Sequence, residues 1–127
     1  MTPLPIRLRA SLNANHQLQQ TLGRTSQRID FHPLVRLFIP TAPAVWLISE
    51  LDTDDQDTFF GLCAPGGMAP HLGHGRLSSL ASLARSHGLR LEHALLSASP
   101  APLSAYLARA RIAHAVVTQA HPEKSRW

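Results

Sequence analysis

The sequence of 127 residues has only one cysteine, Cys63, and no long apolar run. A single cysteine excludes an internal disulfide and favours a reducing compartment. The longest uncharged apolar runs, 37–49 and 94–108, contain prolines and are shorter than the roughly 20 residues that a membrane helix needs. No N-terminal stretch pairs a basic start with a continuous apolar segment, as a signal peptide does. These absences predict a soluble, cytoplasmic protein.

Acidic residues are also scarce, and they are unevenly placed. The chain has 8 acidic and 12 basic residues, and its net charge is +4. Five of the acids lie in one window of eight residues: Glu50, Asp52, Asp54, Asp55 and Asp57. The rest of the chain has 12 basic against 3 acidic residues, or +9. This excess is compatible with an anionic partner such as nucleic acid, and equally with a solvated basic surface.

The length fits one domain with one core. Residues 44–63 predict its centre, because strand-favouring residues at 45–48 and 58–60 flank a turn-favouring stretch at 52–57. A further strand is expected at 34–39. The short link at 40–43 then predicts that the three strands pair as an antiparallel meander.

Along the chain, helices are expected before and after the three strands of this meander. The spacing of leucines predicts a helix over 4–22. Ser78 is expected to cap a second helix that ends at Gly88, and Ser99 and Pro100 are expected to open a third.

Between these helices, the glycine-rich stretch 64–75 predicts a loop, with a brief strand at Arg76 and Leu77. Residues 89–96 predict another strand. The whole pattern predicts a single α+β domain over residues 1–112, with an antiparallel sheet of four or five strands and helices packed on one face. Residues 113–127 are expected to form a partly ordered C-terminal tail.

Six blocks of this sequence carry a family resemblance. They are LPIRLRASLNAN (4–15), HPLVRLFIPTAPAVWLISELD (32–52), DTFFGLC (57–63), HLGHGRLSSL (71–80), GLRLEH (88–93) and PLSAY (102–106). In this order they resemble DUF2958, a bacterial family of unknown function found in plasmids and integrated mobile elements. The resemblance implies a common fold and an accessory role on mobile DNA, but no activity.

The chain departs from the family pattern at two polar positions. It has His-Leu-Gly-His at 71–74 where family members tend to show Glu-Leu-Gly-Tyr, and Glu-His-Ala at 92–94 where they tend to show Glu-Arg-Asp. Either a shared site is altered in this chain, or these positions are structural.

The acidic window is the densest group of candidate site residues. Carboxylate oxygens are ligands of hard cations, but the window lacks the glycine and the distal glutamate of a calcium loop. It is therefore interpreted as a solvated turn or as a docking surface for a basic partner. The second candidate is a polar patch at the mouth of the sheet, formed by His71, His74, Arg76, Glu92 and His93.

Other patterns are weaker. His71, His74 and His93 with Cys63 suggest zinc ligands, but the first two lie in a predicted loop and the cysteine in an apolar strand, where burial is usual. A cysteine nucleophile would need an activating base that the sequence does not identify. We therefore assign no metal, no cofactor and no catalytic residue.

Three functions follow from these patterns. The first is a non-enzymatic accessory protein of a mobile element, which binds another protein and in this way counters host defence or serves transfer. The second is a nucleic-acid-binding factor whose Arg7, Arg9, Arg24 and Arg28 contact backbone phosphates. The third is a small hydrolase or transferase that uses Glu92 and the loop histidines. The sequence favours the first function and leaves the partner and the oligomeric state open.

Overall fold

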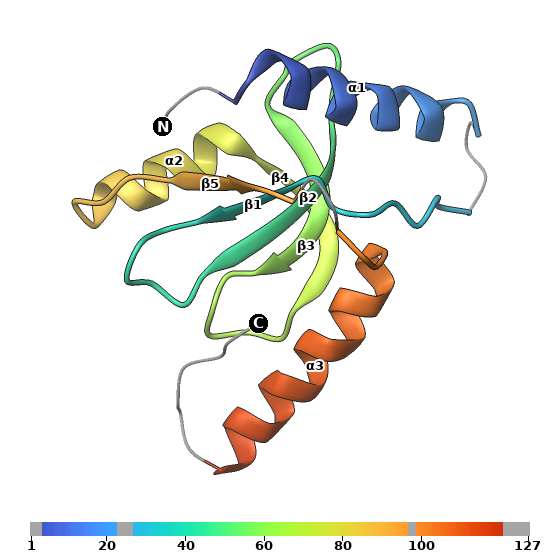
Figure 1. The fold of residues 1–127 in the computed structure, drawn as a ribbon. Coiled ribbons are helices and arrows are strands. Elements are labelled where there is room, and N and C mark those ends of the chain that lie inside the picture. Colours follow the sequence, from blue (N-terminus) through green and yellow to red (C-terminus); the bar gives the residue numbers. More distant parts are fainter. Residues whose placement is uncertain (1–3, 23–26, 97–98, 121–127) are drawn as a thin grey trace.

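The computed structural model describes residues 4–22, 27–96 and 99–120, with side chains as far as residue 114. It contains one antiparallel sheet of five strands and three helices (Figure 1). The strands are β1 (Val35–Phe38), β2 (Val45–Leu51), β3 (Thr58–Ala64), β4 (His71–Arg76) and β5 (Glu92–Leu95). The helices are α1 (Ile6–Gln20), α2 (Leu77–Ser86) and α3 (Leu103–Ala120). The predicted α+β class and antiparallel sheet are confirmed.

The strand order is β4-β3-β2-β1-β5. The first four strands therefore form a meander in which each strand pairs with the next, as predicted for the first three. The chain then leaves one edge of the sheet through α2 and returns as β5 at the opposite edge, beside β1. Two strands, β4 and β5, form the edges.

Both faces of the sheet are covered by helices. On one face, Trp46 and Ile48 of β2 pack with Leu8 and Leu12 of α1 and with residues of α2. On the other face, Leu47 of β2 packs with residues of α3. Figure 1 shows α1 and α3 on opposite sides of the sheet. The helices therefore do not all pack on one face, because β2 and β3 carry large apolar side chains at successive positions and so need cover on both sides.

The stretch 64–75 is not entirely a loop, since residues 71–76 form β4. Glycine disfavours strands, but here the small residue is what permits the pairing. Gly75 lies opposite Phe59 of β3, and a side chain at Gly75 would place its Cβ 2.5 Å from the Phe59 ring. The ring occupies the space that the missing side chain leaves, so packing outweighs local preference.

A bulge in β2 sets the geometry of the site described below. The pairing of β2 with β3 shifts register between Ile48 and Glu50. Glu50 thereby comes to lie opposite Phe60, whose side chain belongs to the α3 face of the sheet. The bulge thus turns the Glu50 carboxylate toward the α3 face of the sheet.

The third helix, α3, begins at Leu103, later than the predicted start at Ser99 and Pro100, and it continues to Ala120. The expected domain boundary after residue 112 therefore falls within α3, and residues 121–127 of the predicted tail lie outside the described residues. Gly88 has a φ of +71°, the left-handed conformation expected after the end of α2. In the described ranges, no helix is long and apolar enough to cross a membrane.

Candidate functional site

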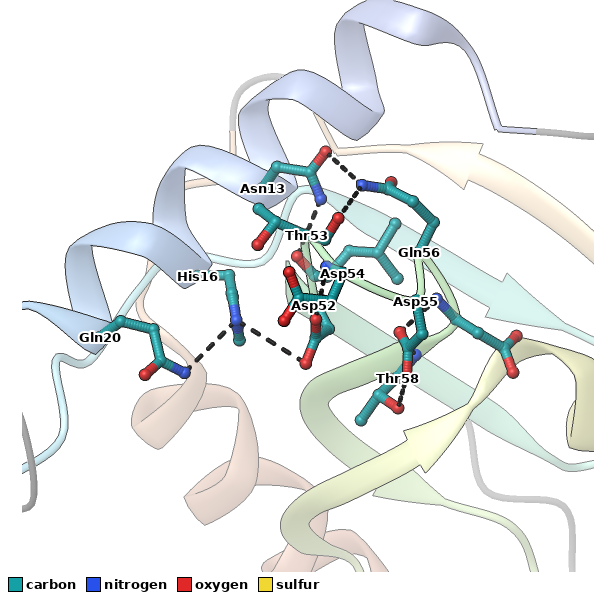
Figure 2. A network of polar contacts seen from close by, with 11 residues as sticks. Asn13, His16, Gln20, Asp52, Thr53, Asp54, Asp55, Gln56 and Thr58 are labelled. Carbon is teal, nitrogen blue, oxygen red and sulfur yellow. Dashed lines mark hydrogen bonds and ion pairs between the residues drawn. The ribbon is translucent and has the colours of Figure 1, made fainter.

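The turn that holds the acidic window is fastened to α1 by amide side chains (Figure 2). Asn13 Nδ2 of α1 donates a hydrogen bond to the Leu51 carbonyl oxygen at 2.9 Å. Gln56 Nε2 donates to Asn13 Oδ1 at 3.2 Å and to the Thr53 carbonyl oxygen at 3.1 Å. His16 Nε2 lies 3.8 Å from Asp52 Oδ2. The turn is therefore a structured element that packs on a helix.

Two of the predicted site carboxylates stabilise the backbone of this turn. Asp52 Oδ1 accepts a hydrogen bond from the Asp54 backbone N–H at 2.7 Å. Asp55 Oδ1 accepts from the backbone N–H groups of Asp57 and Thr58, each at 2.9 Å, and Asp55 Oδ2 accepts from the Thr58 hydroxyl at 2.7 Å. These bonds, with the Thr58 hydroxyl the strongest influence, lower the pKa of Asp55 to about 2. Such contacts are those of aspartate in turns.

Asp57 caps α2. Its Oδ1 accepts a hydrogen bond from the Ser78 backbone N–H at 2.8 Å, and its Oδ2 accepts from the Ser78 hydroxyl at 2.6 Å and from Arg76 Nε at 3.0 Å. Burial alone would raise the pKa of Asp57, but the bonds from Ser78 and the charge of Arg76 hold it below its ordinary value. The prediction that Ser78 itself is the cap is wrong: the helix begins at Leu77, and an aspartate from the β2–β3 turn satisfies its first N–H groups.

Replacing Asp57 with alanine is expected to lower the free energy of unfolding by about 1–2 kcal/mol, the usual cost of losing a helix cap. Asp57→Asn, which keeps an acceptor oxygen, is expected to cost less. Because the folded-state pKa of Asp57 is lowered, its contribution is present above the ordinary value of 3.8 and is lost as the pH falls through the folded-state pKa. Urea unfolding at pH 7 and at pH 3 measures both effects, and equal stabilities of wild type and Asp57→Ala at pH 7 would contradict this role.

One carboxylate of the window, that of Glu50, is buried. Only 3% of its side chain is exposed, and it forms an ion pair with Arg28 from the segment between α1 and β1. The Arg28 guanidinium carbon lies 3.4 Å from the centre of the Phe60 ring, in a cation–π contact. His74 of β4 meets the same ring edge-on, with the ring centres 5.0 Å apart. We call Arg28, Glu50, Phe60 and His74 the Arg28 cluster.

The Arg28 cluster has perturbed acid–base properties. Burial raises the pKa of Glu50, and the opposing charges of Arg28 and His16 only partly offset this effect. Burial also lowers the pKa of His74, and Arg28 and His16 lower it further. A buried carboxylate beside an arginine and two histidines has the composition of a proton-transfer site. Glu50, however, already accepts its hydrogen bond from Arg28, which is the arrangement of a structural ion pair.

The segment that carries Arg28 also makes hydrogen bonds to both α1 and α3. The Ile29 N–H donates to Gln19 Oε1 of α1 at 2.8 Å. Asp30 Oδ1 accepts from the Ser104 backbone N–H at 3.1 Å, and Asp30 Oδ2 accepts from the Ser104 hydroxyl. Asp30 therefore caps α3 as Asp57 caps α2. The Arg28 cluster lies on the sheet beside this segment, which contacts both α1 and α3.

The predicted polar patch is divided by the strand order. His71, His74 and Arg76 lie on β4, whereas Glu92 and His93 lie on β5, at the opposite edge of the sheet. Three strands separate the two groups. The structure thus does not bring Glu92 close to the histidines of β4.

The predicted zinc ligands are separated in the same way. His71 lies opposite Cys63 in the pairing of β3 with β4, while His93 is on β5. Burial raises the pKa of the Cys63 thiol to about 11, which disfavours the thiolate that a nucleophile or metal ligand requires. Within the described ranges, no group of three or more His, Cys, Asp or Glu side chains is placed to hold a metal ion.

The four arginines proposed for nucleic acid have different environments. Arg7 is exposed on α1, Arg9 is partly buried there, and Arg28 belongs to the Arg28 cluster. Arg24 lies outside the described residues. The Arg28 guanidinium is therefore engaged inside the protein, and the nucleic-acid role of the other three stays a prediction.

The sequence groups Glu50 with the acidic turn and does not indicate its partners. The available signal was its position in the stretch AVWLISEL, since a glutamate in an apolar strand requires an internal partner. That this partner is Arg28 depends on the β2 bulge and on the path of the α1–β1 segment, which local sequence patterns do not specify.

The chain matches a known protein family. No curated protein and no solved structure matches the chain. A family described as "Protein of unknown function (DUF2958)" matches residues 4–117, which is most of the chain. This match agrees with the resemblance seen in the six sequence blocks. The chain belongs to the DUF2958 family.

Proposed function

We propose that this protein is a non-enzymatic accessory protein of a mobile genetic element and that it acts by binding another protein. The observation that carries the proposal is the use of the ionisable side chains. Glu50 pairs with Arg28, Asp52 and Asp55 hold a turn, and Asp57 caps α2. These groups serve the fold's own contacts, which favours a function performed by surfaces over one performed by a constellation of acids and bases.

The mobile-element part of the proposal depends on the family resemblance, because plasmids and integrated elements are where the resembled family is found. A protein of this kind helps its element by binding a host protein, for example a component of host defence, or by binding the transfer machinery. A protein-binding role also fits the exposed apolar side chains on three separate elements, namely Leu18 of α1, Leu95 of β5 and Ile112 of α3.

The test is capture followed by reconstitution. Affinity-tagged protein is expressed in a bacterium that carries the element, and the captured protein is then purified separately and mixed with it. We expect a complex of defined stoichiometry in size-exclusion chromatography with light scattering. An unrelated tagged protein of similar net charge is the control. Failure of every captured protein to form such a complex would contradict the proposal.

Nuclease treatment and a salt series separate this function from nucleic-acid binding. A protein–protein complex is expected to survive nuclease and to change little between low and moderate salt. A nucleic-acid complex is expected to weaken steeply, because arginine–phosphate contacts release counterions. A complex that nuclease destroys would favour the nucleic-acid role in place of the proposed one.

A further inference from the structure

We propose that the outer edge of β5 is the docking site for an extended segment of the partner protein, which adds to the sheet as a sixth strand beside β5. This inference rests on the proposed function and names its binding surface. In the described ranges, β5 pairs with β1 on one side, and no strand pairs with its other side. An open edge of this kind offers unpaired backbone N–H and C=O groups to another chain.

The hydrogen bonds of the strand identify the groups that face outward. The Leu96 N–H donates to the Leu34 carbonyl oxygen at 2.9 Å, so residue 96 faces β1. In an antiparallel pair successive residues face alternate sides. Glu92 and Ala94 therefore also face β1, and the N–H and C=O groups of His93 and Leu95 face outward, where a partner strand would bond.

The other edge strand, β4, has two helices as neighbours. Both α2 and α3 contact β4, whereas the extensive contacts of β5 are with β1. Natural sheets protect exposed edges with very short strands, charged side chains, proline, bulges or a covering helix. Strand β5 is 4 residues long and carries one charged residue, Glu92, but it contains neither proline nor lysine, and its pairing with β1 is regular. It also presents Leu95, whose side chain is 57% exposed.

The side chains around the edge specify the chemistry of the partner segment. Leu95 lies opposite Val35, on the face that α1 and α2 cover, and an apolar partner residue beside it would shield its exposed surface. Ala94 lies opposite Arg36, on the α3 face. The Arg36 guanidinium carbon lies 4.4 Å from the centre of the Phe38 ring, and Glu92 lies opposite Phe38 on the same face. Because Ala94 is small, an acidic partner residue beside it would reach the Arg36 guanidinium. The partner strand is therefore expected to alternate apolar residues on one face with acidic residues on the other.

The binding experiment uses a defined probe and the whole protein. The probe is a labelled eight-residue peptide in which valine alternates with threonine and the two central threonines are replaced by glutamate. At a peptide concentration about ten times its dissociation constant, amide exchange at His93 and Leu95 is expected to slow by about tenfold. A peptide with lysine in place of glutamate is expected to bind more weakly. Unchanged exchange at both amides, at every soluble concentration of the glutamate peptide, would overturn the inference.

Proline at Leu95 tests the edge itself. Leu95→Pro removes an outward N–H that makes no bond to β1, and edge strands tolerate proline at such positions. The variant is expected to keep wild-type amide protection in β1 and β2 but to lose peptide binding. Ile6→Asp, which alters an exposed isoleucine on α1, is the control and is expected to bind normally. Equal binding by Leu95→Pro and wild type would overturn the inference.

Further outcomes show whether a partner protein or a second copy occupies the edge. They also separate failure of this inference from failure of the proposed function. A stable dimer of the wild type that Leu95→Pro dissociates would show that a second copy occupies the edge, and would overturn the assignment to a partner. If the captured partner binds Leu95→Pro as tightly as wild type, the edge is not the docking site, although protein binding still stands. If no partner forms a complex with wild type, the proposed function fails whatever the peptide does.

Discussion

Replacing Gly61 with alanine is expected to lower the free energy of unfolding by about 3 kcal/mol or more, at the upper end of the range for overpacking a core. A Cβ at this position would lie 2.1 Å from the Leu47 carbonyl oxygen and 2.9 Å from Ile48 Cα. Both are backbone atoms of β2, so no side-chain rotation relieves the clash. The only relief is to move β2 away from β3 beside the bulge that orients Glu50.

Gly73 provides the matched control for this substitution, because it lies opposite Gly61 in the β3–β4 pairing. The nearest atom to a Cβ at Gly73 is in the His71 side chain, at 3.5 Å, an ordinary contact distance. Gly73→Ala is therefore expected to be nearly neutral. Urea unfolding followed by the fluorescence of the buried Trp46 compares the two variants, and a loss below about 1 kcal/mol for Gly61→Ala would show that the strands can separate at little cost.

The parts of the fold that were predicted correctly have strong local signals. Residues 45–48 and 58–60 are dense in β-branched and aromatic side chains, and the aspartates between them suit a turn, so the hairpin of β2 and β3 follows from sequence. Leucines at helical spacing likewise identify α1, with Leu8 and Leu12 buried against the sheet. Each of these signals lies within the element that it specifies.

The features that were missed depend on residues distant in the sequence. Both α2 and α3 are capped by aspartates from outside their own helices, Asp57 and Asp30. The second of these lies 74 residues before the Ser104 that it binds. A local search for a capping residue selects Ser78 or Ser99, because it considers only adjacent positions. In the same way, β4 exists because Gly75 accommodates the Phe59 ring, a reason that appears only after β3 and β4 are paired.

The candidate site shows the same division. The five acids of the window were recognised as a group, but their separate roles follow from three-dimensional contacts. Asp52 and Asp55 bind within the turn, as their residue type suggests. Glu50 differs from them because the bulge places it in the core beside Phe60. Spacing in the sequence therefore identified the acids but not the one that is buried.

Replacing Arg28 with alanine is expected to lower the free energy of unfolding by about 3 kcal/mol at pH 7, the lower end of the range for removing one partner of a buried ion pair. The lower end applies because Arg28 itself is 34% exposed, whereas its partner Glu50 is only 3% exposed. The variant leaves a carboxylate in the core without its counter-charge and takes the cation–π contact from Phe60. Denaturant unfolding of both proteins between pH 4.5 and pH 7.5 measures this cost.

The stability lost in the Arg28→Ala variant is expected to become smaller as the pH falls. The folded-state pKa of Glu50 is raised above the ordinary 4.5, so its contribution to stability is fully present below that value and is lost as the pH rises through the folded-state pKa. Removing Arg28 takes away a charge that lowers this pKa, so the variant loses stability over a wider pH range than wild type. Arg28 also lowers the pKa of His74. Removing Arg28 therefore makes protonation of His74 less costly, which again makes the loss of stability smaller at low pH.

Glu50→Gln separates the two contributions, since glutamine keeps the size of the side chain and cannot ionise. In that background Arg28→Ala is expected to cost clearly less at pH 7 than in the wild type, because no charge is left unpaired in the core. Any pH dependence that survives there belongs to His74, and Glu50 accounts for the part that disappears. An Arg28→Ala cost that is equal at pH 4.5 and pH 7.5, and unchanged by Glu50→Gln, would mean that Arg28 stabilises the fold through its packing on Phe60 and not through the buried carboxylate.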